Sequence, residues 1–370
     1  MNKQLEYNLD FWKAYDKSKV TMEPSTFSAF CLPYMKRGDV LLDVCCGNGR
    51  DSKYFIDNGL TVVSFDYETL DLKDKKPYFG DDLEIPFDHV YCRFVLHSIP
   101  EELEDYVLIN AHKVLKNEGL LYIEVRSDKG DISDTIDNHY RRLLDIDVLR
   151  NKLTNLNFGI IFEIESKGLS VYNGEDPVLI RFVVQKKGEI RTRGTEREEK
   201  KTYNSVINPL YSIHLLLTVK RIFEENNIPF LLVFGTLLGA YRDKGFIKHD
   251  TDIDLALLDE YRSKVLELID NGYFAIYGFL YTREWHKKEH LMALQYKTDW
   301  VDFWFFKKVG NVYKSGRFYS IKAKQIDNGL STIEFYGYRF KTVKNIEAFL
   351  QRHYPNCNWR VPVVDYHAKF

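Results

Sequence analysis

The stretch LLDVCCGNGRDS, residues 41–52, decides the fold of the first half of the chain. It contains an apolar strand with Asp43, then a tight turn with Gly47 and Gly49, and then the start of a helix. Glycine lets the backbone approach a ligand closely and adopt dihedral angles that a side chain forbids. This order predicts the ligand-binding corner of a parallel sheet, although an ordinary strand-to-helix connection has the same local pattern.

A second acidic residue, Asp66, ends the next apolar run, TVVSFD, 23 residues after Asp43. A carboxylate about 20 residues after the first turn is where nucleotide-binding sheets hold ribose hydroxyls. Ser52 stands where the dinucleotide fingerprint requires a third glycine, and no G-K-[ST] sequence follows. The spacing therefore predicts an adenosine ligand and disfavours NAD and ATP.

Apolar and amphipathic runs alternate on both sides of this corner. The runs are 40–46, 51–59, 61–66, 89–97, 104–119 and 120–127. Strands that alternate with helices predict an α/β fold, a mostly parallel sheet with helices on both faces. Two later runs, 158–170 and 176–186, flank an Asn-Gly turn and predict an antiparallel hairpin at one edge of the sheet.

The first half of the chain resembles class I S-adenosylmethionine-dependent methyltransferases. Their D-x-G-C-G-x-G motif matches residues 43–49, except that Cys45 replaces the first glycine. The resemblance covers residues 1–187 and implies a Rossmann-like domain with S-adenosylmethionine as cofactor. It implies that Asp66 binds the ribose and that Asp81 or Asp82 lies near the adenine. At the methionine end it implies Asp43, Cys46, Gly47, Gly49, Arg50 and Asp51.

The methyl acceptor is expected at the carboxyl ends of the strands. A base is needed there only when the acceptor carries a proton of high pKa, and His97 and Arg126 are the candidate catalytic residues. The other candidates are Arg93, Glu124, His139, Tyr140, Arg141 and Arg142. So many cations favour an anionic acceptor. The alternative is that each is a surface or capping residue.

The boundary between domains is predicted in QKKGEIRTRGTEREEKK, residues 185–201, where charged residues crowd together and Gly188 and Gly194 interrupt any helical pattern. We therefore expect one domain over residues 1–187, a charged linker over 188–202 and a second domain over 203–370. In the second domain, helical spacing over 208–227 and 344–354 and strand-like runs at 229–235, 251–258 and 298–306 predict a small α+β fold.

The sequence FGTLLGAYRDKGFIKHDTDIDLALL, residues 234–258, carries the chemistry of the second half. Residues two apart in a strand share a face, so Asp252 and Asp254 project together. Two adjacent carboxylates repel unless a cation lies between them, and magnesium bound to substrate phosphates is the usual solution. Asp302 is the expected third ligand. Gly235 and Thr236 begin a helical stretch whose amides suit phosphate oxygens.

This stretch resembles the LicD/fukutin family of the nucleotidyltransferase fold, and the resemblance runs from about Tyr203 to the C-terminus. It implies transfer of a phospho-alcohol from a CDP-linked donor onto a sugar. Thr251 interrupts the acidic run, which leaves a ligand role for Asp250 open. Arg242 and Lys244 are expected to reach the diphosphate.

Two weaker patterns occur in the second half. His286 and His290, four residues apart, are a possible zinc pair for which no third ligand is apparent. The tryptophans and tyrosines are expected mostly in the core, with some rings forming a platform for a sugar.

Composition narrows the class of protein. The net charge is −2, from 52 basic and 54 acidic residues, which offers no cationic field for nucleic acid. The most apolar stretch, 228–240, is shorter than the ~18 residues that a transmembrane segment needs. Five scattered cysteines without C-x-x-C spacing favour a reducing compartment. These features predict a cytoplasmic protein, which could work at the inner face of the membrane.

The two halves together predict a bifunctional enzyme of cell-surface polysaccharide modification. Its expected partners are a CDP-linked small-molecule donor and a glycan or lipid-linked saccharide acceptor. The first alternative is a nucleotidyltransferase that moves NMP, fused to a methyltransferase for a related metabolite, because both phosphoryl reactions use the same metal clamp. The second alternative is that one domain acts only as a binding scaffold.

Overall fold

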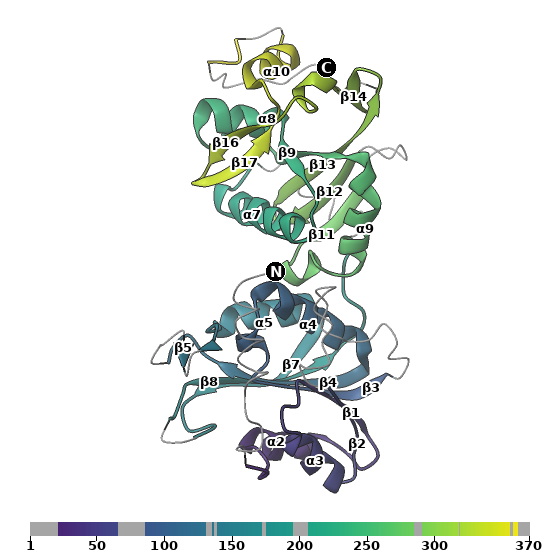
Figure 1. Cartoon of the computed structure of the whole chain (residues 1–370), viewed down its shortest axis with the longest axis vertical. Coiled ribbons are helices and arrows are strands. Elements are labelled where there is room, and N and C mark those ends of the chain that lie inside the picture. The colour runs from purple at the N-terminus through teal and green to yellow at the C-terminus, as the bar shows by residue number, and fades with distance from the viewer. Residues whose placement is uncertain are drawn as a thin grey trace. The chain divides into compact units, whose positions relative to one another are not determined.

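The chain divides into two compact units, Met1–Arg191 and Thr192–Phe370, which are described separately (Figure 1). The computed structural model describes residues 21–65, 86–130, 135–136, 139–171, 175–194, 206–284, 291–317, 319–355 and 358–361. The division falls inside the predicted linker, of which residues 188–194 are described. Within that part, the carbonyl oxygen of Glu189 accepts a hydrogen bond from the side chain of Asn157 at 3.0 Å.

The first unit is built on a sheet whose described strands follow the order β2-β1-β3-β4-β8-β7. These strands are β1 (Val40–Val44), β2 (Thr61–Phe65), β3 (Phe87–Arg93), β4 (Leu115–Arg126), β7 (Phe158–Ser166) and β8 (Leu179–Lys186). The strands β2, β1, β3 and β4 are parallel, whereas β8 runs antiparallel to β4 and β7 antiparallel to β8. The predicted parallel sheet with an antiparallel hairpin at one edge is confirmed.

Helices cover both faces of this sheet, α2 and α3 on one and α4 and α5 on the other (Figure 1). The helical elements are α2 (Thr26–Cys31), η2 (Leu32–Tyr34), α3 (Arg50–Asp57), η5 (Leu96–Ser98), α4 (Glu101–Val114) and α5 (Ile146–Asn155). Two short strands, β5 (Thr135–Ile136) and β6 (His139–Tyr140), pair with each other in an antiparallel ladder. The side chain of Asp145 caps α5 by accepting from two backbone N–H groups. Large rings, among them Phe27, Phe55, Tyr91 and Tyr122, fill the space between sheet and helices.

The helix expected over residues 104–119 ends earlier, at Val114. β4 starts at the next residue, so the Lys-Asn-Glu-Gly segment belongs to the strand. Gly119 lies against the backbone there, because a Cβ on it would stand 2.9 Å from the carbonyl oxygen of Lys116 and 3.0 Å from that of Asp88. The pairing of Leu115 and Leu120 with β3 therefore replaces the helix that the sequence pattern predicted for this segment.

The second unit is built on a mixed sheet in the order β11-β12-β13-β10-β9-β17-β16, and β14 joins β13 to β15. Its strands are β9 (Phe230–Leu232), β10 (Asp252–Leu258), β11 (Leu280–Glu284), β12 (Leu291–Tyr296), β13 (Asp299–Val309), β14 (Val312–Ser315), β15 (Tyr319–Lys322), β16 (Ser331–Phe335) and β17 (Tyr338–Thr342). β10 is parallel to β13 and antiparallel to β9. This pairing places the strand of the D-x-D sequence beside the strand of Asp302.

The helical elements of this unit are α7 (Pro209–Glu225), α8 (Phe234–Leu238), η6 (Gly239–Asp243, a π-helical turn), η7 (Asp259–Tyr261), α9 (Arg262–Asp270), η8 (Ala275–Tyr277), η10 (Ala323–Gln325) and α10 (Ile346–His353). Asn208 caps α7 by accepting from the N–H of Leu210, and Pro209 occupies the first turn, where its missing N–H has no cost. Leu215, Val219 and Ile222 of α7 pack into the core. None of the helices described in the chain is long and apolar enough to cross a membrane.

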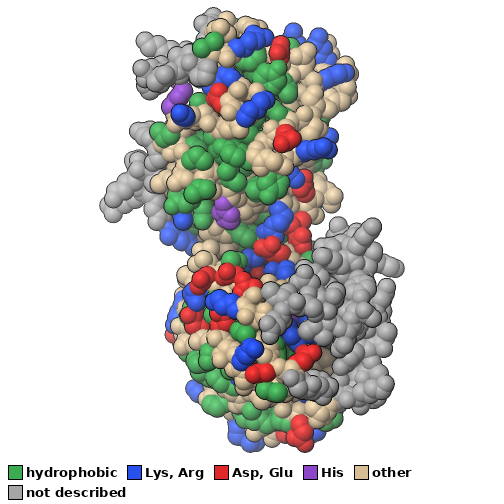
Figure 2. All heavy atoms as spheres, turned by 90° about the vertical axis from the view of Figure 1, so that its left-hand side faces the viewer, with side chains coloured by type: hydrophobic (Ala, Val, Ile, Leu, Met, Phe, Trp, Pro, Cys, Tyr) green, Lys and Arg blue, Asp and Glu red, His purple; other side chains and the backbone are tan. Residues whose placement is uncertain are grey.

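Basic and acidic side chains are interspersed on the face shown in Figure 2, and hydrophobic side chains gather on part of the second unit.

Candidate functional sites

The glycine turn of the first unit adopts left-handed backbone conformations between β1 and α3. Cys45, Gly47 and Gly49 have φ angles of 57°, 60° and 76°. A Cβ on Gly47 or Gly49 would meet no atom within 4 Å, so the backbone angle rather than crowding requires glycine there. The turn thus has open space beside it, as a ligand-binding corner requires.

Asp43 lies at the carboxyl end of β1 and is only 2% exposed. Its Oδ2 accepts a hydrogen bond of 2.5 Å from the hydroxyl of Ser52 on α3. Ser52 occupies the position at which the dinucleotide fingerprint has its third glycine. In the structure its hydroxyl fixes the orientation of the carboxylate of Asp43, which is predicted to bind the cofactor.

Asp51 is directed toward the N-terminus of α2. Its carboxylate accepts hydrogen bonds from the N–H of Ser25 at 2.8 Å and from the hydroxyls of Ser25, Ser28 and Tyr91 at 2.8, 3.0 and 2.9 Å. The neighbouring Arg50 is half-buried, with its Nε 4.0 Å from Asp51. The contacts of Asp51 thus join α2, α3 and β3, and its placement at the methionine end stays a prediction.

Three of the residues predicted to bind the methyl acceptor, Arg93, Glu124 and Arg126, form ion pairs at the carboxyl ends of the strands. Glu124 is fully buried and accepts from Nε of Arg93 at 2.9 Å and from Nε of Arg181 at 2.6 Å. Arg126 donates to Glu175 at 3.2 Å. Because carboxylates neutralise much of this charge, the cationic surroundings that favoured an anionic acceptor are weaker than the sequence suggests.

The structure brings the two candidate catalytic residues of this unit together. His97 is 3% exposed, and its Nδ1 accepts from the backbone N–H of Arg126 at 3.3 Å. Arg142 donates from its side chain to Glu104 and from its backbone to the carbonyl of His97. Arg141 follows β6 and is half-buried.

Several of the predicted site residues are among those that the structure does not describe. The ribose and adenine candidates Asp66, Asp81 and Asp82, the pair His286 and His290, and the side chains of His139 and Tyr140 lie outside the described residues.

In the second unit, three of the predicted metal ligands meet on one sheet. Asp254 of β10 is the register partner of Asp302 on β13, and Asp252 is the partner of Trp300. Asp254 and Asp302 are 7% and 3% exposed. The parallel pairing therefore brings together carboxylates that are far apart in the sequence.

Asp254 is held by contacts from two elements, α8 and β13. Its Oδ2 accepts from the N–H of Gly235 on α8 at 3.1 Å, and its Oδ1 accepts from the indole N–H of Trp304 at 2.8 Å. Its own backbone N–H donates to the hydroxyl of Thr236 at 2.8 Å. The predicted G-[ST] turn thus contacts the acidic strand directly, and a phosphate role for its other groups stays a prediction.

Repulsion among carboxylates is strong at this site. Burial raises the pKa of Asp254 well above its ordinary value, and Asp252, Asp250 and Asp302 raise it further, while the hydrogen bond from Trp304 lowers it. Burial and the charge of Asp252 raise the pKa of Asp250 to about 7. Carboxylates this close favour a cation.

Gly235 has a steric reason to be glycine. A Cβ on it would stand 2.5 Å from Oδ2 of Asp250 and 3.4 Å from Oδ2 of Asp254. Both carboxylates therefore approach the same point of α8. This places Asp250, whose role the sequence left open, beside the predicted ligands.

The two predicted diphosphate-binding cations are engaged within their own segment. Arg242 donates through Nε and Nη2 to both carboxylate oxygens of Asp243 at 2.7 Å, and Nζ of Lys244 donates to the carbonyl of Tyr241 at 3.0 Å. Among the described residues, no group of three or more His, Cys, Asp or Glu side chains stands ready to hold a metal ion. A metal would therefore need side chains to turn or substrate oxygens to complete its shell.

Aromatic residues border this site, and among them is Trp304, one of the tryptophans expected only in the core or in a platform for a sugar. Trp304 is the most informative, because it follows Asp302 by two positions and so shares its face of β13. That spacing in WVDFWFF is the sequence signal that could have identified it.

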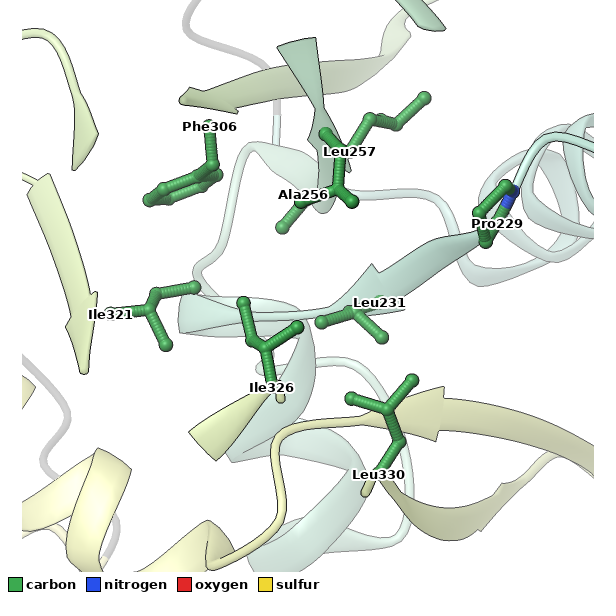
Figure 3. A pocket seen from close by; sticks show the side chains of 9 residues that line it. Pro229, Leu231, Ala256, Leu257, Phe306, Ile321, Ile326 and Leu330 are labelled. Atoms are coloured by element: carbon green, nitrogen blue, oxygen red, sulfur yellow. The ribbon is translucent and has the colours of Figure 1, made fainter. Parts of the chain in front are cut away.

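A small apolar hollow lies farther along the same sheet, between the ends of β9, β10 and β13 (Figure 3). Leu231, Ala256, Phe306, Ile321 and Leu330 are among its lining residues. Hydrocarbon side chains offer no partner for a phosphate, so this hollow is not the polar centre of the unit.

Comparisons with known proteins match the two halves separately. Residues 18–159 match the family model of a methyltransferase domain. Residues 227–344 match the model of the nucleotidyltransferase domain of LicD, FKTN and FKRP. A comparison with curated proteins gave no match.

Solved structures similar to the chain include the 1,6-didemethyltoxoflavin-N1-methyltransferase of Burkholderia thailandensis, with 19% identity over 50% of this chain and 85% of that chain and a TM-score of 0.36. The glycopeptide N-methyltransferase MtfA is 16% identical over 43% of this chain and 94% of that chain, with a TM-score of 0.33. The [4+2]-cyclase SpnF is 14% identical over 50% of this chain and 94% of that chain, with a TM-score of 0.38.

The family models confirm the two resemblances and the predicted fold classes. The chain therefore joins a Rossmann-like methyltransferase domain in its N-terminal half to a LicD-family nucleotidyltransferase domain in its C-terminal half.

Proposed function

We propose that the chain is a bifunctional enzyme of cell-surface polysaccharide modification. Its first domain transfers a methyl group from S-adenosylmethionine. Its second domain transfers a phospho-alcohol from a CDP-linked donor to a glycan or lipid-linked saccharide. The observation that carries the proposal is the approach of Asp250 and Asp254 to Gly235 at the start of α8, with Asp302 the register partner of Asp254 on β13. Burial raises the pKa of Asp254 there, and the charges of Asp252, Asp250 and Asp302 raise it further.

This donor set fits a magnesium ion. Carboxylate oxygens are the hard ligands that magnesium prefers, and magnesium in such sites keeps waters and substrate phosphates as further ligands. Asp252, Asp254 and Asp302 would hold it, and a bound ion would neutralise charge on the donor diphosphate. Gly235, Thr236 and Trp304 keep Asp254 in one orientation. Arg242 and Lys244 would have to release their present partners to reach a diphosphate.

In the first domain, the open glycine turn and the buried Asp43 support binding of S-adenosylmethionine. Asp43, Cys46, Gly47, Gly49 and Arg50 are the proposed contacts, with Asp66 at the ribose and Asp82 near the adenine. Asp51, whose carboxylate is engaged by Ser25, Ser28 and Tyr91, is proposed to stabilise the domain instead. His97 is the proposed base, oriented by the backbone N–H of Arg126. Precise alignment of acceptor and methyl group would supply most of the rate, because methyl transfer depends on geometry more than on acid–base chemistry.

The test is an incubation of the full chain with magnesium and a panel of CDP-alcohols, including CDP-glycerol and CDP-choline, and oligosaccharide acceptors. Release of CMP together with a phospho-alcohol on the saccharide, seen by mass spectrometry, supports the second activity. Pyrophosphate in place of CMP when CTP is the donor supports NMP transfer instead. The absence of both products, with S-adenosylmethionine still bound, would leave the second domain as a scaffold and overturn the proposal.

A further inference from the structure

Three partly exposed rings stand beside the acidic centre of the second domain. Trp304 of β13, Tyr319 of β15 and His353 of α10 are half-buried. We call these three residues the aromatic wall. The indole N–H of Trp304 contacts Asp254 at 2.8 Å, so the wall begins at a predicted metal ligand.

The rings of the wall lie close to one another. The centroids of Trp304 and Tyr319 are 4.5 Å apart, and those of Tyr319 and His353 are 6.1 Å apart with planes inclined by 27°. Behind them, Phe234 stacks on His353 at 4.4 Å, and Phe349 lies nearly parallel to His353 at 5.9 Å. The buried pair fixes the wall, because α8 and α10, which carry these phenylalanines, pack against each other (Figure 1).

The wall carries no charge at neutral pH. Burial lowers the pKa of His353 to about 4, and the other two side chains are neutral. A phosphate needs cations or several N–H donors, which these rings do not supply in number. A planar heterocycle, in contrast, is bound favourably when it stacks on an aromatic ring.

We propose that the aromatic wall binds the planar base of the nucleotide donor whose diphosphate lies at Asp252, Asp254 and Asp302. This inference rests on the proposed function of the second domain. Trp304 joins the two parts of the site, since its ring belongs to the wall and its N–H positions Asp254. Stacking of the base on the aromatic wall therefore positions the diphosphate of the donor beside the three aspartates.

The test compares CDP with ribose 5-diphosphate, which differs only in lacking the base. Both are titrated calorimetrically into the full chain in the presence of magnesium. We expect wild type to bind CDP about 5- to 150-fold more tightly, since stacking of one base contributes about 1–3 kcal/mol. Tyr319→Leu should lose most of this advantage while its affinity for ribose 5-diphosphate stays unchanged, which also shows that the variant is folded.

Two matched variants complete the experiment. Tyr319→Phe keeps the ring and should keep the advantage, as should Tyr338→Leu, which removes a tyrosine 49% exposed on β17 away from the wall. CDP should also quench tryptophan fluorescence in wild type and not in Trp304→Phe.

The outcomes separate the two proposals. If wild type binds CDP tightly and Tyr319→Leu binds it equally well, the wall is not the base site, although the proposed function stands. If wild type binds CDP no better than ribose 5-diphosphate, the proposal that the aromatic wall binds the base is also refuted. If it binds neither compound, the proposed function fails, and the inference fails with it.

Discussion

Asp254 and Asp302 are direct register partners on the adjacent parallel strands β10 and β13. Register partners in parallel strands point to the same face, so two buried carboxylates share one side of the sheet. Burial raises the pKa of Asp254 well above its ordinary value, and the charges of Asp252, Asp250 and Asp302 raise it further. Two like-charged buried carboxylates lower the free energy of unfolding unless a cation binds between them.

The first prediction follows from this pair. Asp254→Asn and Asp302→Asn each remove one charge with little change of shape. Each should lower magnesium-dependent CMP release from a CDP-alcohol at least 100-fold, which corresponds to about 3 kcal/mol in the barrier.

The matched control is Asp259→Asn, in the turn after β10, where the carboxylate only pairs with Arg262 on the surface. It should retain near-normal CMP release. Methyl transfer should continue in all three variants. Full CMP release by Asp254→Asn would refute the assignment of the metal ligands.

The second prediction concerns stability. Magnesium should raise the melting temperature of the second domain, because it removes repulsion present only in the folded state. At a hundredfold excess over its dissociation constant, an ion that binds only the folded state adds about 2.7 kcal/mol. Calorimetry with and without magnesium measures this shift, and Asp254→Asn should abolish most of it. An equal shift in that variant would place the ion elsewhere.

The third prediction separates the two aspartates of the glycine-turn region. Asp43→Asn should weaken S-adenosylmethionine binding about tenfold, because a buried carboxylate at the turn is replaced by a neutral amide. Isothermal titration of the full chain measures the affinity. Unchanged affinity would exclude Asp43 from the cofactor site.

Asp51→Asn is expected to act differently. Asp51 accepts four hydrogen bonds from Ser25, Ser28 and Tyr91, so the loss of its charge should destabilise the first domain by about 2 kcal/mol. Denaturant unfolding tests this, and cofactor affinity should change little. A large loss of affinity at unchanged stability would instead support the role at the methionine end that the resemblance implies.

The fourth prediction is a pH dependence of the first domain. His112 of α4 is fully buried, and burial together with the charge of Lys186 lowers its pKa to about 4. The unfolded chain, with a histidine pKa of about 6.5, then binds more protons than the folded chain between these values. The free energy of unfolding should therefore fall by about 2 kcal/mol as the pH drops from about 6.5 to about 4.

His112→Leu should remove this part of the acid sensitivity, measured as the difference in unfolding free energy between pH 7.5 and pH 4.5. An unaltered pH dependence in His112→Leu would show that other groups cause it.

Local patterns in the sequence were sufficient for much of the fold. The glycine turn between β1 and α3, the hairpin of β7 and β8, and the strand of Asp252 and Asp254 depend on periodicity and turn chemistry within a few residues. The end of α4 was missed, because the chain from Leu115 onward pairs with β3 instead of continuing the helix. That pairing joins segments that are far apart in the sequence, so no local pattern predicts it.

The sequence by itself determined which residue types carry the chemistry: glycines with left-handed angles, a D-x-D strand and a third aspartate. Only the tertiary structure decided what they touch. The pairing of β10 with β13 placed Asp302 and Trp304 beside Asp254. The pairing of β3 with β4 joined Arg93 to Glu124 and so neutralised part of the expected positive charge at the acceptor site. The reason is physical: side-chain direction follows from local backbone geometry, whereas charge balance depends on partners that only strand pairing supplies.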